Sequence, residues 1–294
     1  MSAALSMTAS ILKLRIGSFV ALAALIGVLT TAGGVLTWIE VLVFTTAVLG
    51  ASGAAGAYNH YYERDTDLLM ARTFNRPFAS KTLKAGAIWP LTFLGLLAGS
   101  LFMGWSVGGT LATALVFLGA ATYALVYTVW LKRRSVWNVV IGGASGSFAL
   151  LAGAAAAAPV YGPAIGPIPI LLAATLFLWT PPHFWALAAA KGEDYRRAGI
   201  PMLPVVTEHA VWGPVIFSHV VVLVALSLGP LLYGMGWVYG VCAVFGGGYF
   251  LLQSWRLLWS DTRRAAMGTF RASLLQFALL GLGVIGDRAA AWAF

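Results

Sequence analysis

Residues 41–77 read VLVFTTAVLGASGAAGAYNHYYERDTDLLMARTFNRP, a largely apolar stretch that runs directly into a charged one. An apolar run of about 20 residues is long enough to cross a bilayer as a helix. Gly50, Gly53 and Gly56 recur at three-residue spacing within it, which lets neighbouring helices approach closely. The stretch therefore predicts a tightly packed membrane helix that carries a polar group at one end.

The composition extends this prediction to the whole chain. Of the 294 residues 60% are hydrophobic and only 9% are charged, and the mean hydropathy is +0.87. A soluble domain of this size needs more charge to cover its surface. We predict an all-α polytopic membrane bundle that forms one domain over residues 1–294. About nine transmembrane helices are expected, at 16–38, 41–61, 86–106, 111–130, 138–158, 168–190, 211–232, 237–259 and 272–292.

The basic residues predict the orientation of these helices. In the nine-helix arrangement, every lysine and arginine except Arg288 falls on the side of the membrane that carries the N-terminus. By the positive-inside rule this side is cytoplasmic, and the expected location is a bacterial inner membrane. The net charge of +9 is then mainly a topology signal. It requires no nucleic-acid partner, and part of it is available to anionic membrane lipid.

Asn59, Glu63 and Asp67 are spaced four residues apart at the polar end of the second span. On a helix this spacing keeps the three side chains on one face, with a drift of about 40° per step. Oxygen ligands in this arrangement suit Mg²⁺ together with phosphate oxygens. Arg72 and Arg76 follow, again four apart, and guanidinium groups bind phosphate well. Two interpretations fit the pattern: a metal–diphosphate site, or a polar helix next to the membrane with ordinary i,i+4 ion pairs.

Two further polar clusters lie on the same predicted side of the membrane. Lys132 and Arg133 either signal topology or reach the diphosphate. Glu193 and Asp194 are the other paired acids in the chain. They are placed to share a site with Glu63 and Asp67. Because both acidic clusters fall at cytoplasmic helix ends, we expect them to meet at one cavity mouth.

His183 follows Pro181 and Pro182 inside the sixth predicted span. The two prolines remove hydrogen bonds from the helix ladder, and they predict a break there. A histidine within the membrane is costly to bury and is therefore a functional candidate. The alternative is a histidine that makes only a structural hydrogen bond.

Three blocks of this sequence resemble those of the protoheme IX farnesyltransferases, or haem O synthases, a branch of the UbiA-type intramembrane prenyltransferases. The blocks are Asn59-xxx-Glu63-xxx-Asp67 with Arg72 and Arg76-Pro77; Lys132-Arg133 with Asn138 and Gly142-Gly143; and Trp179-Thr180-Pro181-Pro182-His183-Phe184-Trp185 through Asp194-Tyr195. The last block is specific to the haem branch. The chain departs from the superfamily at Ala190 and Lys191, where an earlier aspartate is usual, and the haem branch shares this loss. It departs from the branch itself at 148–151, where a Pro-Pro pair is usual.

The resemblance implies transfer of a farnesyl group from farnesyl diphosphate to a vinyl group of haem B, giving haem O. It implies a catalytic set of Asn59, Glu63, Asp67 and Asp194, with Mg²⁺ bound by these four and Glu193. It implies diphosphate binding by Arg72, Arg76, Lys81, Lys132 and Arg133, and haem binding by His183, with His60 as second choice. A haem A synthase or another oxidase-assembly protein is a candidate partner.

Two other functions remain open from the sequence. The first is prenyl transfer to an aromatic or quinone-precursor acceptor. The second is transport, which also uses broken helices and charged clusters. Transport is disfavoured because a transport site needs ionisable groups near the membrane midplane, whereas the acids here crowd one side.

Overall fold

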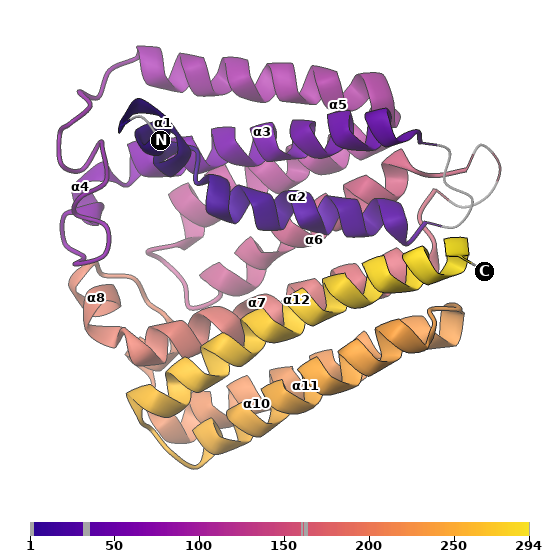
Figure 1. The fold of residues 1–294 in the computed structure, drawn as a ribbon. Coiled ribbons are helices and arrows are strands. Elements are labelled where there is room, and N and C mark those ends of the chain that lie inside the picture. The colour runs from indigo at the N-terminus through magenta and orange to yellow at the C-terminus, as the bar shows by residue number, and fades with distance from the viewer. Residues whose placement is uncertain (1–2, 32–35, 160, 162–163, 294) are drawn as a thin grey trace.

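The computed structural model describes residues 3–31, 36–159, 161 and 164–293, and every regular element within them is a helix. Residues 32–35, at the end of the first predicted span, lie outside the described part. The long helices run side by side as a bundle, and the short helices α4 and α8 lie at the same end of it (Figure 1). The elements are α1 (Ala3–Ile11), α2 (Leu14–Leu29), α3 (Trp38–Tyr62), α4 (Arg64–Asp67), α5 (Ile88–Ala121), the π-helix η1 (Thr122–Leu131), α6 (Asn138–Ala156), α7 (Pro167–Ala190), α8 (Gly192–Arg197), α9 (Leu203–Val206), α10 (His209–Ser227), the 3₁₀-helix η2 (Gly229–Tyr233), α11 (Trp237–Leu258) and α12 (Arg263–Ala293).

The protein is a multi-pass membrane protein. In the described residues, 6 helical stretches are long and apolar enough to cross a membrane, and up to 7 if the bent pair of α1 and α2 is one span. One of these stretches, Ile88–Leu131, is 44 residues long. The predicted count of nine spans is not confirmed by this criterion and stays a prediction.

The stretch Ile88–Leu131 reverses direction near its middle. A straight helix of this length would extend about 66 Å, roughly twice the thickness of a bilayer core. Gly109, with φ 70° and ψ −170°, interrupts the helical backbone. Both ends of the stretch therefore reach the same end of the bundle (Figure 1): Trp89 packs on Phe78 with ring centroids 5.3 Å apart, and Lys132 pairs with Glu63. The break falls between the predicted spans 86–106 and 111–130.

Small residues set the spacing of the central helices. A β-carbon placed on Gly27 of α2 would meet the backbone of Leu150 in α6, and one placed on Gly153 of α6 would meet the backbone of Ala24 in α2. Only glycine permits backbones to approach this closely, as small-residue packing in membranes requires. Close packing of α2 on α6 thus fixes the relative position of these two helices.

The helix α7 continues through Pro181 and Pro182, so the predicted break there is wrong. Each proline lacks the N–H that would bond to the carbonyl four residues earlier. Helices α6, α10 and α12 all pack against α7, and such packing supports a proline-containing helix in a membrane. His183 consequently lies on an intact helix.

Candidate functional site

The predicted polar face of Asn59, Glu63 and Asp67 lies where α3 ends and the chain turns into α4. Asn59 is in the last turns of α3, Glu63 is the residue between the two helices, and Asp67 ends α4. Their exposed fractions are 1%, 2% and 0%. Burial to this degree requires partners for all three side chains, because an unpaired buried carboxylate is strongly unfavourable.

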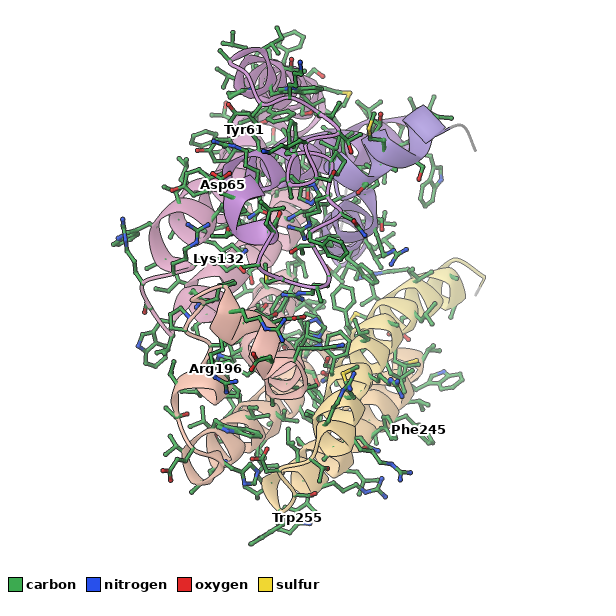
Figure 2. All side chains as sticks on the ribbon, turned by 90° about the vertical axis from the view of Figure 1, so that its left-hand side faces the viewer. Tyr61, Asp65, Lys132, Arg196, Phe245 and Trp255 are labelled. Atoms are coloured by element: carbon green, nitrogen blue, oxygen red, sulfur yellow. The ribbon has the colours of Figure 1, made fainter. Side chains whose placement is uncertain are left out.

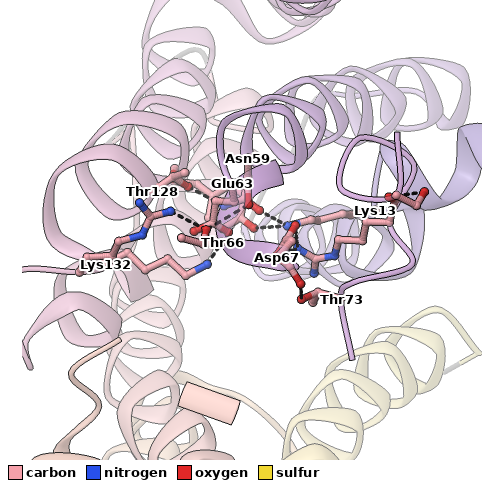
Figure 3. A network of polar contacts seen from close by, with 12 residues as sticks. Lys13, Asn59, Glu63, Thr66, Asp67, Thr73, Thr128 and Lys132 are labelled. Carbon is pink, nitrogen blue, oxygen red and sulfur yellow. Dashed lines mark hydrogen bonds and ion pairs between the residues drawn. The ribbon is translucent and has the colours of Figure 1, made fainter. Parts of the chain in front are cut away.

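A cation contacts the oxygen of each of these side chains (Figure 3). The Lys13 ammonium donates to Asn59 Oδ1, and the Lys132 ammonium forms an ion pair with Glu63. Nη1 of Arg76 donates to Asp67 Oδ2 at 2.8 Å and to Oδ1 at 2.9 Å.

The orientation of the Asn59 amide follows from its hydrogen bonds. The Thr128 hydroxyl donates its proton to the Tyr123 carbonyl at 2.8 Å, an i,i+5 contact that the π-helix η1 provides. The Thr128 oxygen can therefore accept from Asn59 Nδ2, at 2.9 Å. This bond turns Asn59 Oδ1 toward Lys13. The sequence predicted an ordinary helix here, and the wider π-turn brings Tyr123 and Thr128 to the site.

The charged groups at this site shift one another's pKa values. Burial alone would raise the pKa of the Glu63 carboxyl, but the Lys132 ammonium, together with Lys13 and Arg76, outweighs burial and holds that pKa below its ordinary value of 4.5. Burial lowers the pKa of Lys132 below its ordinary 10.5, and Glu63 offsets only part of that shift. The two ammonium groups also lie over aromatic rings, Lys13 at 5.6 Å from the Tyr123 ring and Lys132 at 5.6 Å from the Tyr127 ring.

Lys13 is the functional candidate that the sequence analysis missed. It lies at the 60° bend between α1 and α2, in the left-handed region with φ 49°. A lysine rarely adopts this conformation, and such strained residues cluster at functional sites. Its position near the start of a span suggested only a topology signal. No local pattern connects it with Asn59, which is 46 residues away.

The second acidic cluster lies beside the first. The Arg72 guanidinium is 4.7 Å from the centroid of the Tyr195 ring in α8. Met70 is buried in the same apolar cluster as Tyr195 and Ala198. Figure 2 looks onto this end of the bundle, where Asp65 and Arg196 face the viewer from α4 and α8. The loop that follows α4 therefore contacts α8, and the meeting of the two pairs of acids at one mouth stays a prediction.

The remaining predicted residues take different positions around this mouth. Arg133 donates to Thr66 Oγ1 at 2.6 Å. Lys81 is exposed in the loop after α4, with φ 61°. Glu193 is also exposed, and its carboxylate binds Arg196 at 2.9 Å and Arg197 at 3.0 Å. Asp194 is half-buried, and no cation of the described residues pairs with it.

Both histidines proposed for haem are buried. His60 is 3% exposed, and its Nδ1 has no hydrogen-bond partner. His183 is 7% exposed and lies seven residues before the end of α7, about 10 Å along the helix axis. It therefore lies in the apolar part of the bundle, farther from the polar end than the charged residues around Glu63 and Asp67.

The residues present fit a divalent cation by their donor chemistry. Among the described side chains, no group of three or more His, Cys, Asp and Glu residues is placed to share one metal ion. However, Asn59, Glu63 and Asp67 offer hard oxygen atoms, and each already binds a cationic nitrogen of the protein. Oxygen atoms of this kind are the preferred ligands of Mg²⁺.

Fold and site together define a helical membrane protein with a buried polar site, in which three cations contact two carboxylates and an amide, at one end of an apolar bundle. Residues 20–280 match the UbiA prenyltransferase family. The chain belongs to that family.

Relatives and solved structures agree with this assignment. Protoheme IX farnesyltransferase 2 of Paramagnetospirillum magneticum is 50% identical over 280 residues, which cover 95% of this chain and 96% of that protein. A structure from work on digeranylgeranylglyceryl phosphate synthase in membranes has a TM-score of 0.79 at 16% identity, covering 97% of this chain and 98% of that one. A UbiA homologue from Archaeoglobus fulgidus, bound to GPP and Mg²⁺, has a TM-score of 0.65 at 15% identity, covering 95% and 99%. At these identities the two structures establish the shared fold.

Proposed function

We propose that this chain transfers the farnesyl group of farnesyl diphosphate to a vinyl group of haem B, giving haem O and diphosphate. The observation that carries the proposal is the buried set of Asn59, Glu63 and Asp67, each bound to a cation and joined to α8 by the Arg72–Tyr195 contact. Half of the residues are identical to those of a relative named protoheme IX farnesyltransferase 2, which supports haem as the acceptor.

The diphosphate binds at the charged mouth in this proposal. Lys13, Arg76 and Lys132 are deep in the site and exchange their present oxygen partners for phosphate oxygens. The more exposed Arg72, Lys81 and Arg133 approach from the surrounding loops. Guanidinium and ammonium groups both bind phosphate strongly through charge-assisted hydrogen bonds.

The oxygen ligands of the site then become available for a divalent cation, which we propose is Mg²⁺. Asn59, Glu63 and Asp67 would hold it from one side, and Asp194 and Glu193 from α8. When bound, such an ion neutralises charge on the diphosphate. The Archaeoglobus fulgidus homologue described with GPP and Mg²⁺ supports this assignment.

The protein catalyses the reaction by stabilising the leaving group. The allylic C–O bond breaks, and its electron pair goes to the diphosphate oxygen, where negative charge grows. Lys13, Arg76 and Lys132 are already in place for that charge, so no reorganisation is needed during the step. The vinyl π-electrons of haem B form the new C–C bond, water adds to the resulting cation, and a proton is released. The apolar bundle excludes water from the allylic cation before this bond forms.

We propose that His183 contacts the haem, with His60 as the second choice. His183 lies among apolar and aromatic side chains on α7, where a porphyrin is better accommodated than at the charged mouth. A haem A synthase or another oxidase-assembly protein remains our candidate for receiving the product.

We also propose nine crossings of a bacterial inner membrane by one domain, with the N-terminus and the site on the cytoplasmic side. Dividing Ile88–Leu131 at Gly109 and counting α11, a 22-residue helix, supports the count of nine. The concentration of basic residues at the end of the bundle that carries the site supports the orientation.

The experiment is to incubate the purified full chain with haem B, farnesyl diphosphate and Mg²⁺ and to identify the products by mass spectrometry. We expect a haem whose mass increases by one farnesyl group and one hydroxyl group. A parallel reaction supplies an aromatic quinone precursor without haem. Prenylation of the aromatic compound together with unmodified haem would replace this proposal with the alternative acceptor.

A further inference from the structure

The ring of His183 is held in one orientation by aromatic side chains. It stacks on Trp179 with centroids 4.2 Å apart and planes 18° apart. It packs against Phe270 at 4.6 Å, and the edge of Phe184 contacts it at 4.9 Å. Trp179 Nε1 donates to the Ser273 carbonyl at 2.8 Å, which ties α12 to α7 at this level.

The hydrogen bonds of Ser273 determine which nitrogen of His183 carries the proton. The Ser273 hydroxyl has one proton, and it donates this proton to the Phe270 carbonyl at 2.7 Å. Ser273 Oγ also lies 2.7 Å from Nδ1 of His183. Because the hydroxyl proton is already used, Oγ acts as the acceptor in this second bond and Nδ1–H is the donor. The neutral imidazole therefore has a free electron pair on Nε2.

The Nε2 atom of His183 has no hydrogen-bond partner among the described residues. This atom is also not fully enclosed by the described residues. An unpartnered atom that is not enclosed is accessible, so Nε2 presents its electron pair to a ligand.

We infer that Ser273 is a positioning residue, which fixes the Nδ1–H form of His183 and aims the Nε2 electron pair at the iron of the acceptor haem. This inference rests on the proposed function for the identity of the ligand, but the Ser273–His183 geometry exists without it. A ligating histidine commonly donates its other N–H to a hydrogen-bond acceptor, which fixes the tautomer and makes the ligand more basic. Loss of such an acceptor typically weakens metal binding by about 10–100-fold.

The first test measures the tautomer in the absence of substrate. The full chain is prepared in detergent micelles with ¹⁵N-histidine, and the signal of His183 among the 4 histidines is assigned with His183→Ala. We expect a protonated Nδ1 and an unprotonated Nε2 in the wild type. Ser273→Ala changes this pattern, and Ser273→Thr, which keeps the hydroxyl, preserves it. An Nε2–H form in the wild type would overturn the inference.

The second test measures haem binding. Ferric haem B is titrated into the same proteins, and the Soret band gives the Kd and the ligation state. We expect the Kd of Ser273→Ala to rise about 10–100-fold with an altered Soret band, and Ser273→Thr to restore both. Ser254→Ala is the matched control, because Ser254 is equally buried and donates to a carbonyl three residues back, Leu251 at 3.0 Å.

The two tests separate this inference from the proposed function. A Ser273→Ala protein whose tautomer and haem affinity both match those of Ser254→Ala would overturn the positioning role. A wild-type protein that forms no prenylated haem would instead contradict the proposed function. The NMR measurement needs no substrate, so it decides the role of Ser273 in either case.

Discussion

Asp67→Asn is the substitution that tests the charged mouth most directly. The Asp67 carboxylate is fully buried and accepts two bonds from Arg76 Nη1, at 2.8 and 2.9 Å. Asparagine has nearly the same shape, keeps one acceptor oxygen and removes the negative charge. The change therefore alters the electrostatics of the site with little change in packing.

The expected cost in stability is moderate. One charge-assisted hydrogen bond is worth about 1.5–3 kcal/mol. Removing one partner of a fully buried ion pair costs about 3–5 kcal/mol, but the Arg76 side chain is 26% exposed, so water can solvate it and the lower range applies. The protein should remain folded. Turnover should fall by about 10²–10³-fold, the usual effect of removing one preorganised electrostatic contact.

The assay measures haem O formation by mass spectrometry, diphosphate release, ferric haem binding and the thermal midpoint in detergent. Haem affinity should stay within about 3-fold of wild type, because His183 lies on a different helix. Asp65→Asn is the control, because the Asp65 side chain is 83% exposed and, within the described part of the chain, pairs only with Arg64 at 3.8 Å. Turnover of Asp67→Asn near that of the wild type, or an equal loss in Asp65→Asn, would refute the metal and diphosphate assignment.

The remaining predictions concern the ion pair, the amide orientation, the helix crossing and the metal. The pKa of Glu63 is lower in the folded chain than its ordinary 4.5, so its stabilising effect is complete above that pH and is lost as the pH falls through the folded-state pKa. Glu63→Gln should therefore flatten the dependence of the thermal midpoint on pH on the acid side of pH 4.5. Thr128→Val removes the acceptor of the Asn59 amide and should lower kcat/KM for farnesyl diphosphate about 10-fold, measured at saturating haem. Gly153→Val should destabilise the bundle by more than about 3 kcal/mol, measured by denaturant unfolding in micelles, because its side chain meets backbone. Removing divalent cations with EDTA should abolish turnover, and Mg²⁺ should restore it.

Each of these predictions has a contradicting outcome. An unchanged acid limb in Glu63→Gln would assign the acid sensitivity to other carboxylates. Thr113→Val, which loses a bond to the Gly109 carbonyl, should retain kcat/KM, and a loss equal to that of Thr128→Val would remove the role of the amide. A β-carbon at Gly95 would meet no atom within 4 Å, so Gly95→Val should stay near wild type. Equal destabilisation would contradict close packing as the cause. Full turnover in EDTA would exclude a divalent cation.

The four-residue spacing predicted one polar helix end that carries Asn59, Glu63 and Asp67, and these residues lie at the end of α3 and in α4, whereas metal binding by them stays a prediction. Asn59, Glu63 and Asp67 are four residues apart, and the helical repeat alone places them together even though α3 ends at Tyr62. The break predicted at Pro181 failed for a related reason: a local rule describes the lost hydrogen bonds but not the packing that holds α7 together. The number of spans also depends on such details, since the backbone of one residue, Gly109, divides Ile88–Leu131.

The sequence by itself determined the membrane class and the polar helix end that carries Asn59, Glu63 and Asp67, because composition sets the preference for lipid and a helix repeats every 3.6 residues. Only the tertiary structure decided which partners these residues have. Lys13 reaches Asn59 across 46 residues, Lys132 reaches Glu63 across 69, and Ser273 reaches His183 across 90. Such pairs arise from the crossing of helices whose surfaces fit one another, and periodicity along one helix carries no information about that fit.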